Sequence, residues 1–455
     1  MNLTCFKAYD IRGRLGAELD TAIAYRIGRA FADVMGARLV VLGRDNRQSS
    51  AELAQAVARG VQDAGATVLD LGLAGTEEMY FATTHFGACG GIEITASHNP
   101  IDYNGMKMVK AGSAPLDSAT ELAAIRAAAE AETPPPVAKR GGARDIQATA
   151  RAAYVAGVLG FVDVAHLRPL RVLVNAGHGS AGPTFDALAA RVLEQGAPLE
   201  IRRLHHHPDG SFPQGIPNPL LPENQQVTSD GVRAEGADIG IAWDGDFDRC
   251  FFFDETGAFV DGAYIVGLLA AAFVAREPGA VIVHDPRIIW NTRHIVAQAG
   301  GRAVQARTGH AYIKSALRAH GAVYGGEMSA HHYFRDFMCC DSGMIPWLLV
   351  LELMGRRAQP LSALVAQMRA AFPASGEINF RVADPQAVIR RIESAYAPGA
   401  LARDDMDGLS LDMGAWRFNL RSSNTEPVLR LNVETRGDRA LLDRQLDRLR
   451  DLIVG

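Results

Sequence analysis

The stretch ARLVVLGRD at residues 37–45 opens the part of this 455-residue chain that decides its fold. It is followed by SSAELAQAVARGVQDAG at 49–65, TVLDLGL at 67–73 and GGIEITASHN at 90–99. Short apolar runs of strand type therefore alternate with an amphipathic segment of helical periodicity, which is typical of an α/β unit. Because helical segments connect the runs, we expect the strands to lie largely parallel.

The same alternation of strands and helices returns twice further along the chain. The second series occupies residues 144–160, 168–177, 183–196 and 237–248, and the third occupies residues 263–276, 280–286, 291–300, 310–329 and 345–355. Before the second series, TPPPVAKRGG at 133–142 predicts a linker, because its prolines and glycines do not fit regular elements.

The last part of the chain has a different character. From about residue 370 it is richer in charge, with helical stretches at 384–396 and 438–455 around strands at 416–423 and 428–435. This pattern predicts a small α+β domain. The sequence thus predicts three similar α/β domains with mixed, mostly parallel sheets, and a C-terminal α+β domain. Their expected boundaries are 1–145, 146–252, 253–368 and 369–455.

Composition excludes several classes of protein. Hydrophobic residues make up 48% of the chain and charged residues 21%, as in ordinary globular proteins. A net charge of -5 disfavours a nucleic-acid binder. The five scattered cysteines form neither a disulfide framework nor a C-x-x-C zinc motif. Because the chain also lacks a signal-peptide pattern and a run of 18 apolar residues, we expect a cytoplasmic protein without membrane contact.

Ser97 is the first candidate for chemistry, in the loop TASHNP that follows the predicted strand GGIEIT. Serine nucleophiles are often held in such strand-end loops. A plain turn, in which the polar side chains bond their own backbone, fits the string as well. Lys107 favours the first interpretation. Only five of the 46 basic residues are lysines, so a lysine beside this loop indicates phosphate binding or proton transfer.

Asp244, Asp246 and Asp248 alternate directly after an apolar strand and predict a site for a hard divalent cation. In an extended strand these carboxylates would be about 6.7 Å apart, too far for one Mg²⁺ with ligands at about 2.0–2.1 Å. We therefore expect the backbone to curl, at Gly245. A calcium EF-hand is excluded, because Arg249 stands where that loop needs glycine and the next residues, CFFFD, form a strand. A solvated acidic turn remains the alternative.

Two further groups of polar residues are suited to a phosphorylated sugar. In GGEMSAH at 325–331, Glu327, Ser329 and His331 hold alternate positions, so they could face one way and bind vicinal hydroxyls. RSSNT at 421–425 joins one guanidinium to four small hydrogen-bonding side chains, a cup suited to a phosphate oxyanion. A half-buried strand edge and a polar turn are the respective alternatives.

Five strings, in order over the whole chain, resemble the α-D-phosphohexomutase superfamily: FKAYDIRG, TASHNPIDYNGMK, DGDFDRC, GGEMSAHHYF and RSSNTEPVLRLNVE. Within it the chain is most similar to the bacterial phosphomannomutases. Met328, where phosphoglucosamine mutases usually have Gln, disfavours that branch. The resemblance implies three α/β domains and an α+β domain around a central active-site cleft. It also implies an isomerase that interconverts mannose 6-phosphate and mannose 1-phosphate for GDP-mannose synthesis.

The resemblance assigns roles residue by residue. It implies that Ser97 carries a phosphate, which holds Mg²⁺ together with Asp244, Asp246 and Asp248. The residues implied at the reacting end are Arg12, Lys107, Arg249 and His310, and His98 and Lys107 are the two candidates for proton transfer. The implied substrate-binding residues are Tyr9, Arg287, His310, Glu327, Ser329, His331, Arg421, Ser423, Asn424 and Thr425. Arg287 stands where many relatives have lysine, and His178 where they often have Asn.

The implied cofactors are Mg²⁺ and a hexose 1,6-bisphosphate activator. Hexose phosphates are the expected partners, with no nucleic acid, membrane or obligate protein partner. Within the class, the rival is a phosphoglucomutase or an enzyme that acts on both sugars. Outside it, the rivals are a metal-dependent phosphatase that uses the acidic loop alone and a non-catalytic sensor of sugar phosphates.

Overall fold

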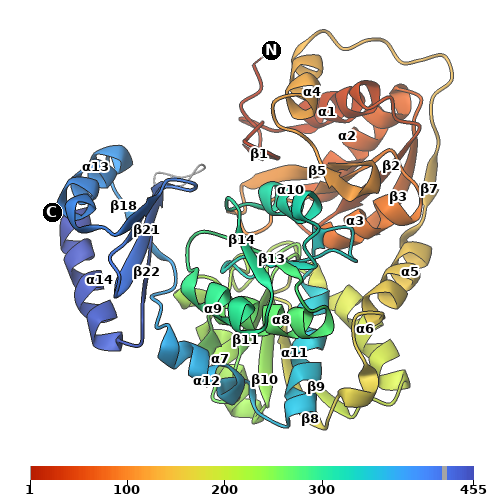
Figure 1. Ribbon diagram of the computed structural model, residues 1–455. Coiled ribbons are helices and arrows are strands. Elements are labelled where there is room, and N and C mark those ends of the chain that lie inside the picture. The colour runs from red at the N-terminus through yellow and green to blue at the C-terminus, as the bar shows by residue number, and fades with distance from the viewer. Residues whose placement is uncertain (1, 423–427) are drawn as a thin grey trace. The chain divides into compact units, whose positions relative to one another are not determined.

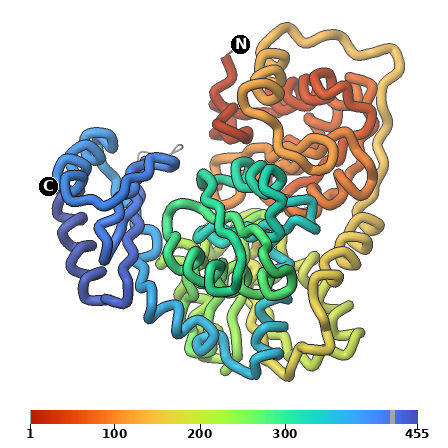
Figure 2. Tube along the Cα trace, in the orientation of Figure 1, coloured from red at the N-terminus to blue at the C-terminus, as the bar shows by residue number. Residues whose placement is uncertain are grey.

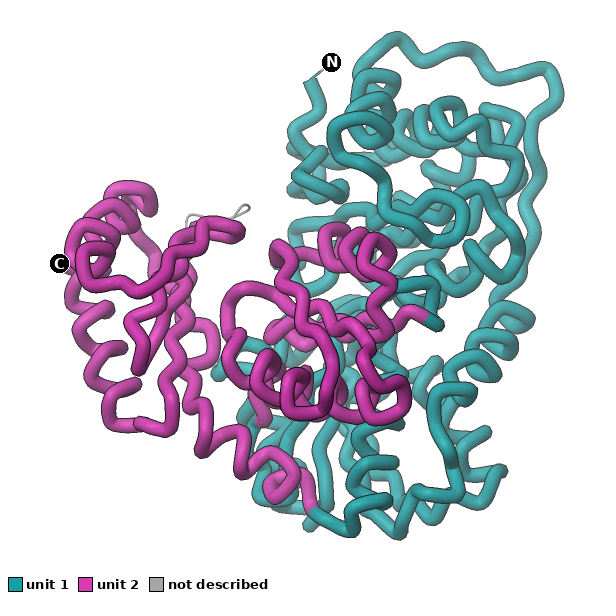
Figure 3. The backbone as a smooth tube through the Cα atoms, in the orientation of Figure 1, with its two compact units in different colours: residues 1–259, 336–359 teal, residues 260–335, 360–455 magenta. Residues whose placement is uncertain are grey.

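The computed structural model describes residues 2–422 and 428–455 (Figure 1), and Figure 2 shows the same path as a tube. Contacts divide the chain into two compact units (Figure 3). Unit 1 consists of residues 1–259 and 336–359, and unit 2 of residues 260–335 and 360–455. Ser423, Asn424 and Thr425, which the resemblance places at a phosphate, lie outside the described residues.

The first α/β domain of unit 1 is built on a mixed seven-stranded sheet. Its elements are β1 (Ile11–Arg14), α1 (Thr21–Val34), β2 (Leu39–Arg44), α2 (Ser50–Asp63), β3 (Thr67–Leu73), α3 (Thr76–His85), β4 (Gly90–Ile94), β5 (Tyr103–Lys110), η1 (Ala111–Ser113), β6 (Ala114–Pro115), α4 (Glu121–Glu130) and β7 (Ala143–Asp145). The strand order is β1-β5-β4-β2-β3-β7, with β6 on β5. β2 is parallel to β3 and β4, whereas β5 is antiparallel to β1 and β4.

The second α/β domain of unit 1 repeats this plan on a smaller sheet. Its elements are α5 (Gln147–Leu159), η2 (Val164–His166), β8 (Leu170–Asn175), α6 (Ala181–Glu194), β9 (Leu199–Leu204), η3 (Pro222–Asn224), α7 (Gln226–Glu235), β10 (Ile239–Trp243) and β11 (Cys250–Phe253), followed by β12 (Phe259–Val260), where the chain passes into unit 2. β8 is parallel to β9 and β10, and β11 returns antiparallel to β10. The acidic run 244–248 is the connection between β10 and β11.

The last helix of the predicted third series packs in unit 1. It is α11 (Met344–Arg357), preceded by β17 (Cys340–Asp341). The ring centroids of Trp347 and of Phe185 on α6 lie 5.3 Å apart. Glu77 of α3 accepts hydrogen bonds from the backbone N–H groups of Gly343 and Met344, at 2.9 and 3.1 Å. The carboxylate thereby binds free donors at the helix N-terminus.

The third α/β domain lies in unit 2. Its elements are α8 (Gly262–Arg276), β13 (Val281–His284), α9 (Trp290–Gln298), β14 (Arg302–Gln305), α10 (His310–His320), β15 (Tyr324–Gly326), β16 (His332–Phe334) and α12 (Leu361–Ala371). β13 is parallel to β14 and β15, and β15 and β16 form an antiparallel hairpin.

The C-terminal domain is an antiparallel sheet with two helices. Its elements are β18 (Ile378–Arg381), α13 (Pro385–Tyr396), η4 (Ala397–Gly399), β19 (Ala402–Asp404), β20 (Leu409–Asp412), β21 (Trp416–Ser422), β22 (Val428–Thr435) and α14 (Arg439–Val454). The strand order is β18-β22-β21-β20-β19. The two predicted strands are β21 and β22, and three shorter strands join them. The predicted architecture of three α/β domains and one α+β domain is confirmed.

Two features of the described residues concern the environment of the chain. None of the helices there combines the length and the apolarity needed to cross a bilayer. The five cysteines, all within the described ranges, form no disulfide bond.

Candidate active site

Ser97 lies in the loop after β4, with its side chain pointing at the acidic loop. Its backbone is left-handed, with a φ of 49°, a conformation that is strained for a residue with a Cβ and is often found at functional sites. Its Oγ donates to Asp244 Oδ2 at 2.7 Å and lies 3.0 Å from His98 Nδ1. Arg249 donates to the same His98 nitrogen at 2.6 Å. The predicted nucleophile therefore contacts both a carboxylate and a histidine.

The three aspartates of the acidic loop come together. One carboxylate oxygen from each of Asp244, Asp246 and Asp248 lies within 4.8 Å of the others, and all three residues are buried. The expected curl is present, but its left-handed residue is Phe247, with a φ of 48°, rather than Gly245. Gly245 serves a different purpose. A Cβ there would lie 2.7 Å from the carbonyl oxygen of Ser97, so only glycine allows the two loops to approach this closely.

Lys107 of β5 supplies the positive charge at the centre of this cluster. Its Nζ bonds Asp246 Oδ2 at 2.7 Å and also bonds Asp248, while Thr76 Oγ1 donates to Asp246 at 2.6 Å. Burial opposes the charged form of Lys107, but the carboxylates raise the pKa of its ammonium above the ordinary value. Burial likewise opposes ionisation of Asp246, yet the ammonium lowers the pKa of that carboxyl below its ordinary value. Both groups therefore carry their charges.

The acidic loop has the donor set that a divalent cation needs. Within the described chain, the buried Oδ1 atoms of Asp244 and Asp246 accept no hydrogen bond. A buried carboxylate oxygen without a donor is costly unless a cation satisfies it. Oxygen ligands of this kind, held close together, are those that Mg²⁺ prefers. The residues present thus fit the predicted metal.

Arg12, on β1, contacts the loop that carries Ser97, and Tyr9 lies just before β1. Arg12 Nη1 donates to Asn99 Oδ1 at 2.6 Å, and its Nη2 donates to Asp10 at 2.9 Å. Burial disfavours the charge on this guanidinium, but Asp10, Tyr9 and Asp246 together raise its pKa. Of the residues predicted at the metal and the reacting end, all but His310 lie in unit 1, and so does Tyr9.

The sequence did not reveal two residues that support this site. Thr76, at the start of α3, donates to Asp246 as described above. Arg47, in the loop after β2, donates four hydrogen bonds to backbone carbonyls within residues 97–103. Because β2 and β4 are parallel neighbours, the loops that follow them share one edge of the sheet. The strand order, once known, could have pointed to Arg47.

Arg287 organises the predicted sugar-binding residues of unit 2. Its Nη2 donates to Ser329 Oγ at 3.0 Å and to Glu327 Oε2 at 3.4 Å. Glu327 also accepts from the Tyr333 hydroxyl at 2.6 Å and from the backbone N–H of Gly309 at 3.1 Å. His310 follows Gly309 directly, at the start of α10. Glu327, Ser329, Arg287 and the 308–310 loop are thus brought together.

The expectation that Glu327, Ser329 and His331 alternate along one strand is wrong. The backbone N–H of Glu327 donates to the carbonyl of His331 at 2.9 Å, and Ala330 is left-handed with a φ of 71°. The chain therefore reverses between β15 and β16, because this short segment closes a hairpin. The ring of His331 stacks on Tyr333, with centroids 6.0 Å apart.

Arg421 of β21 is tied to the sugar-binding group by Glu377, which the sequence analysis missed. Glu377 contacts three guanidiniums, those of Arg421 at 3.0 Å, Arg287 at 3.2 Å and Arg430 at 3.6 Å. Burial would raise the pKa of its carboxyl, but the arginines lower it to about 2. The local string EINF carries no motif that could have identified it.

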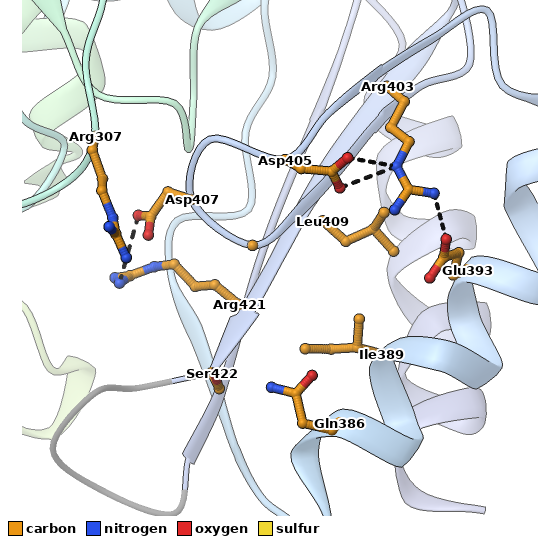
Figure 4. A pocket seen from close by; sticks show the side chains of 11 residues that line it. Arg307, Gln386, Ile389, Glu393, Arg403, Asp405, Asp407, Leu409, Arg421 and Ser422 are labelled. Carbon is orange, nitrogen blue, oxygen red and sulfur yellow. Dashed lines mark hydrogen bonds and ion pairs between the residues drawn. The ribbon is translucent and has the colours of Figure 1, made fainter.

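A polar cavity of about 300 Å³ lies beside Arg421 in unit 2 (Figure 4). Arg307 reaches it from the loop before α10, and Asp407 and Arg403 reach it from the β19–β20 region. Asp407 lies 3.9 Å from Arg421 Nη1. The guanidinium of Arg421 thus forms an ion pair with Glu377 and also borders this open, charged cavity.

The fold and these residues define a class of protein. A serine hydroxyl set among three carboxylates, a lysine and an arginine is the equipment of a phosphoryl-transfer enzyme, which works by positioning and charge stabilisation. Sequence profiles of the three alpha/beta/alpha domains of phosphoglucomutase/phosphomannomutase match residues 4–135, 152–257 and 261–372, and the profile of its C-terminal domain matches 377–452. The chain belongs to the phosphoglucomutase/phosphomannomutase family.

Known relatives match nearly the whole chain. A phosphomannomutase of Salmonella typhimurium is 58% identical over 443 residues, which cover 97% of each chain. A protein of Xanthomonas campestris pv. campestris described as phosphohexose mutases is 52% identical over 455 residues, which cover 100% of both. The crystal structure of a phosphoglucomutase/phosphomannomutase family protein from Burkholderia thailandensis is 33% identical, with a TM-score of 0.85, over 100% of this chain and 97% of that one.

Proposed function

We propose that the protein is a phosphomannomutase that interconverts mannose 6-phosphate and mannose 1-phosphate and so supplies GDP-mannose synthesis. The observation that carries the proposal is the hydrogen bond from Ser97 Oγ to Asp244, inside the cluster of buried aspartates and cations. The relative from Salmonella, a phosphomannomutase by name, supports mannose as the sugar. The name of the Xanthomonas relative keeps an enzyme that acts on both mannose and glucose phosphates as the second candidate.

Ser97 carries the phosphoryl group in this proposal. The carboxylates of Asp244, Asp246 and Asp248, together with the phosphate on Ser97, would hold Mg²⁺. When bound, Mg²⁺ neutralises charge on the phosphoryl oxygens. Lys107 and Arg249, which already bond these carboxylates, stabilise the charge from the side of the protein.

The reaction exchanges one P–O bond for another. The free O1 or O6 hydroxyl of the hexose phosphate attacks phosphorus, the P–Oγ bond of phosphoserine breaks, and the hydroxyl proton passes to a nearby base. His98, 3.0 Å from Ser97 Oγ, and Lys107 are the two candidates for proton transfer. The ammonium of Lys107 is already protonated, so it can donate a proton to the leaving Oγ, whereas His98 can accept the proton of the hydroxyl. The product is a hexose 1,6-bisphosphate, which returns its other phosphate to Ser97. Added bisphosphate acts as an activator because it phosphorylates Ser97 in the same way.

The residues of unit 2 hold the remainder of the hexose phosphate. Glu327 accepts hydrogen bonds from sugar hydroxyls, and Ser329 and His331 bind further hydroxyls. Arg287 orients Glu327 and Ser329. Arg421, with Ser423, Asn424 and Thr425, binds the phosphate that does not react. His310 lies beside the residues that bind the sugar hydroxyls. The substrate must bind in two orientations, and two hexose epimers differ at one hydroxyl. Separate groups of residues for the hydroxyls and for the phosphate allow the substrate to bind in both orientations and as either epimer.

The direct test compares the wild-type protein with Ser97→Ala. We expect intact-mass analysis to find one phosphate on the wild-type chain after treatment with hexose 1,6-bisphosphate, and none on the variant. We also expect turnover of mannose 1-phosphate to fall at least about 10³-fold, because the covalent intermediate is lost. Ser211→Ala, at an exposed serine of unit 1, is the matched control. Full turnover by Ser97→Ala would refute the proposal.

A two-substrate assay separates the candidate functions. Mannose 1-phosphate and glucose 1-phosphate are supplied in turn with Mg²⁺ and a bisphosphate primer, and both the isomer and inorganic phosphate are measured. Faster isomerisation of the mannose ester supports the proposal, and equal rates support an enzyme that uses both sugars. Steady release of inorganic phosphate without isomer identifies a phosphatase, and binding without turnover identifies a sensor.

A further inference from the structure

Arg47 is a buried arginine whose side-chain hydrogen bonds all go to the backbone of the phosphoserine loop and its flank. Only 2% of the residue is exposed. Its two terminal nitrogens donate to the carbonyl oxygens of Ser97 at 3.0 Å, Asn99 at 2.6 Å, Pro100 at 2.9 Å and Tyr103 at 3.1 Å. One side chain thus binds four carbonyls of a single loop.

These bonds add to the few backbone hydrogen bonds of the loop, such as those from Asn99 N–H to the carbonyl of Ala96 at 2.9 Å and from Tyr103 N–H to the carbonyl of Pro100 at 3.0 Å. Residues 97–102 form neither helix nor strand. Buried carbonyls without a donor cost about 1–3 kcal/mol each. A planar guanidinium presents five N–H groups in a fixed fork, whereas a lysine ammonium donates from a single point. Arginine is therefore suited to bind several inward-facing carbonyls at once, and lysine is not.

The loop that carries Arg47 is itself held from two directions. The backbone N–H of Arg47 donates to Asp45 Oδ1 at 3.0 Å, within the first α/β domain. Asn46 donates to the carbonyl of His178, in the second α/β domain, at 2.7 Å. The Arg47 guanidinium also lies over the ring of Phe212, 5.8 Å from its centroid. Arg47 is thus a fixed support rather than a flexible surface side chain.

We propose that Arg47 is a positioning residue for phosphoryl transfer. It holds residues 97–103 so that Ser97 keeps its left-handed backbone and directs Oγ at Asp244. It donates only to backbone in the loop, so its effect on the reaction passes through the geometry of Ser97. The inference rests on the proposed function and deepens it.

The expected signature is a change in kcat rather than in KM. Displacing a reacting group by about 1 Å costs about 10²-fold in rate. Arg47→Lys keeps the charge but loses the fork, so we expect kcat for mannose 1-phosphate to fall about 10- to 100-fold. The KM should stay within about threefold, because the residues proposed to hold the sugar lie in unit 2. Phosphorylation of Ser97 by hexose 1,6-bisphosphate should slow by the same factor as kcat.

Arg29→Lys is the matched control. Arg29 is also buried in the first α/β domain and also donates to backbone carbonyls, those of Asp63 at 2.9 Å and Pro135 at 3.3 Å. Both substitutions should lower Tm, and only Arg47→Lys should lower kcat. If the two variants lose activity in proportion to Tm, or if Arg47→Lys keeps kcat within twofold, the inference is wrong.

A milder variant covers the case in which Arg47→Lys does not fold. Asn46→Ala removes the hydrogen bond to His178 and leaves the guanidinium in place. We expect a smaller fall in kcat, again without a matching rise in KM, and an unchanged kcat would count against the inference. Wild-type activity and phosphoserine are measured first. If the wild-type protein lacks turnover and phosphoserine, the proposed function is wrong. If wild-type turnover is normal and the Arg47 variants are also normal, only this inference is wrong.

Discussion

Three features of the structure place the side chain of Ser97 beside Asp244. Arg47 binds its carbonyl, the left-handed backbone turns its side chain, and Gly245 leaves room for the close approach. Arg249 then bridges Asp244 and His98, at 2.6 Å from each. The serine hydroxyl is therefore held within hydrogen-bonding distance of both groups.

At this scale we predict that turnover depends on a divalent cation held by the aspartates. Chelation with EDTA should abolish mutase activity of the wild-type protein, and added Mg²⁺ should restore it. Asp246→Asn removes one charge from the set, so we expect kcat to fall at least about 10²-fold and the Mg²⁺ concentration for half-maximal activity to rise. The measurement is an initial-rate titration with Mg²⁺.

Asp254→Asn is the control for this prediction. Asp254 is a buried aspartate of unit 1 that accepts hydrogen bonds in the turn after β11, at 3.1 Å from the N–H of Thr256. Its substitution should leave the Mg²⁺ dependence unchanged. Full activity of thoroughly chelated wild-type protein would remove the metal from the proposed mechanism.

At the scale of elements, the acidic loop and the first turn of α3 pack as one structure. The backbone N–H of Thr76 donates to the carbonyl of Asp246 at 3.3 Å, in addition to the side-chain bond. Gly75, just before the helix, lies against the ring of Phe247, the left-handed residue of the acidic loop. A Cβ on Gly75 would stand 2.1 Å from that ring.

We therefore predict that Gly75→Ala disturbs both stability and activity. The added methyl group must push Phe247 aside, and overpacking of this kind costs about 1–3 kcal/mol. We expect a lower Tm and a reduced kcat, because Phe247 sits between two of the aspartates. Gly142→Ala is the control, since a Cβ there meets nothing within 4 Å. Equal Tm and kcat for the two variants would show that the close packing at Gly75 has no consequence.

At the scale of the whole molecule, buried histidines link stability to pH. His284, at the end of β13, bonds the carbonyl of Asp285 through Nδ1 at 2.7 Å and accepts from Arg293 at 3.3 Å through Nε2. Burial, reinforced by Arg293 and Arg417, lowers the pKa of His284 to about 4. The unfolded chain, with an ordinary histidine pKa near 6.5, binds this proton first as the pH falls.

The free energy of unfolding should therefore decrease as the pH falls below about 6.5, by about 2 kcal/mol for His284 at pH 5. Asp285 opposes this trend, because burial raises the pKa of its carboxyl to about 6 and the folded state gains a proton there. The decisive measurement is the difference between variants. The Tm of His284→Asn should change less between pH 7.5 and pH 5 than that of the wild type. Parallel Tm curves would contradict the prediction.

Much of the fold and of the candidate site followed from local patterns. Apolar periodicity located the strands and helices of three α/β domains, because burial on one or two faces leaves a repeat within a few residues. Ser97 and the three aspartates were recognised because each stands in a polar string beside an apolar strand, and Lys107 because lysine is rare in this chain. The short strands of the C-terminal sheet escaped detection, since a half-buried strand of three or four residues shows too little periodicity.

By itself, the sequence determined most of the elements and which side chains are candidates for the chemistry, because both depend on patterns of neighbouring residues. Only the tertiary structure decided that Phe247 rather than Gly245 makes the turn, that the 327–331 segment closes a hairpin, and that α11 joins unit 1. It also decided that Arg47 and Glu377 support the proposed sites. Each of these depends on packing and hydrogen bonds in three dimensions that leave no recognisable pattern in the neighbouring residues.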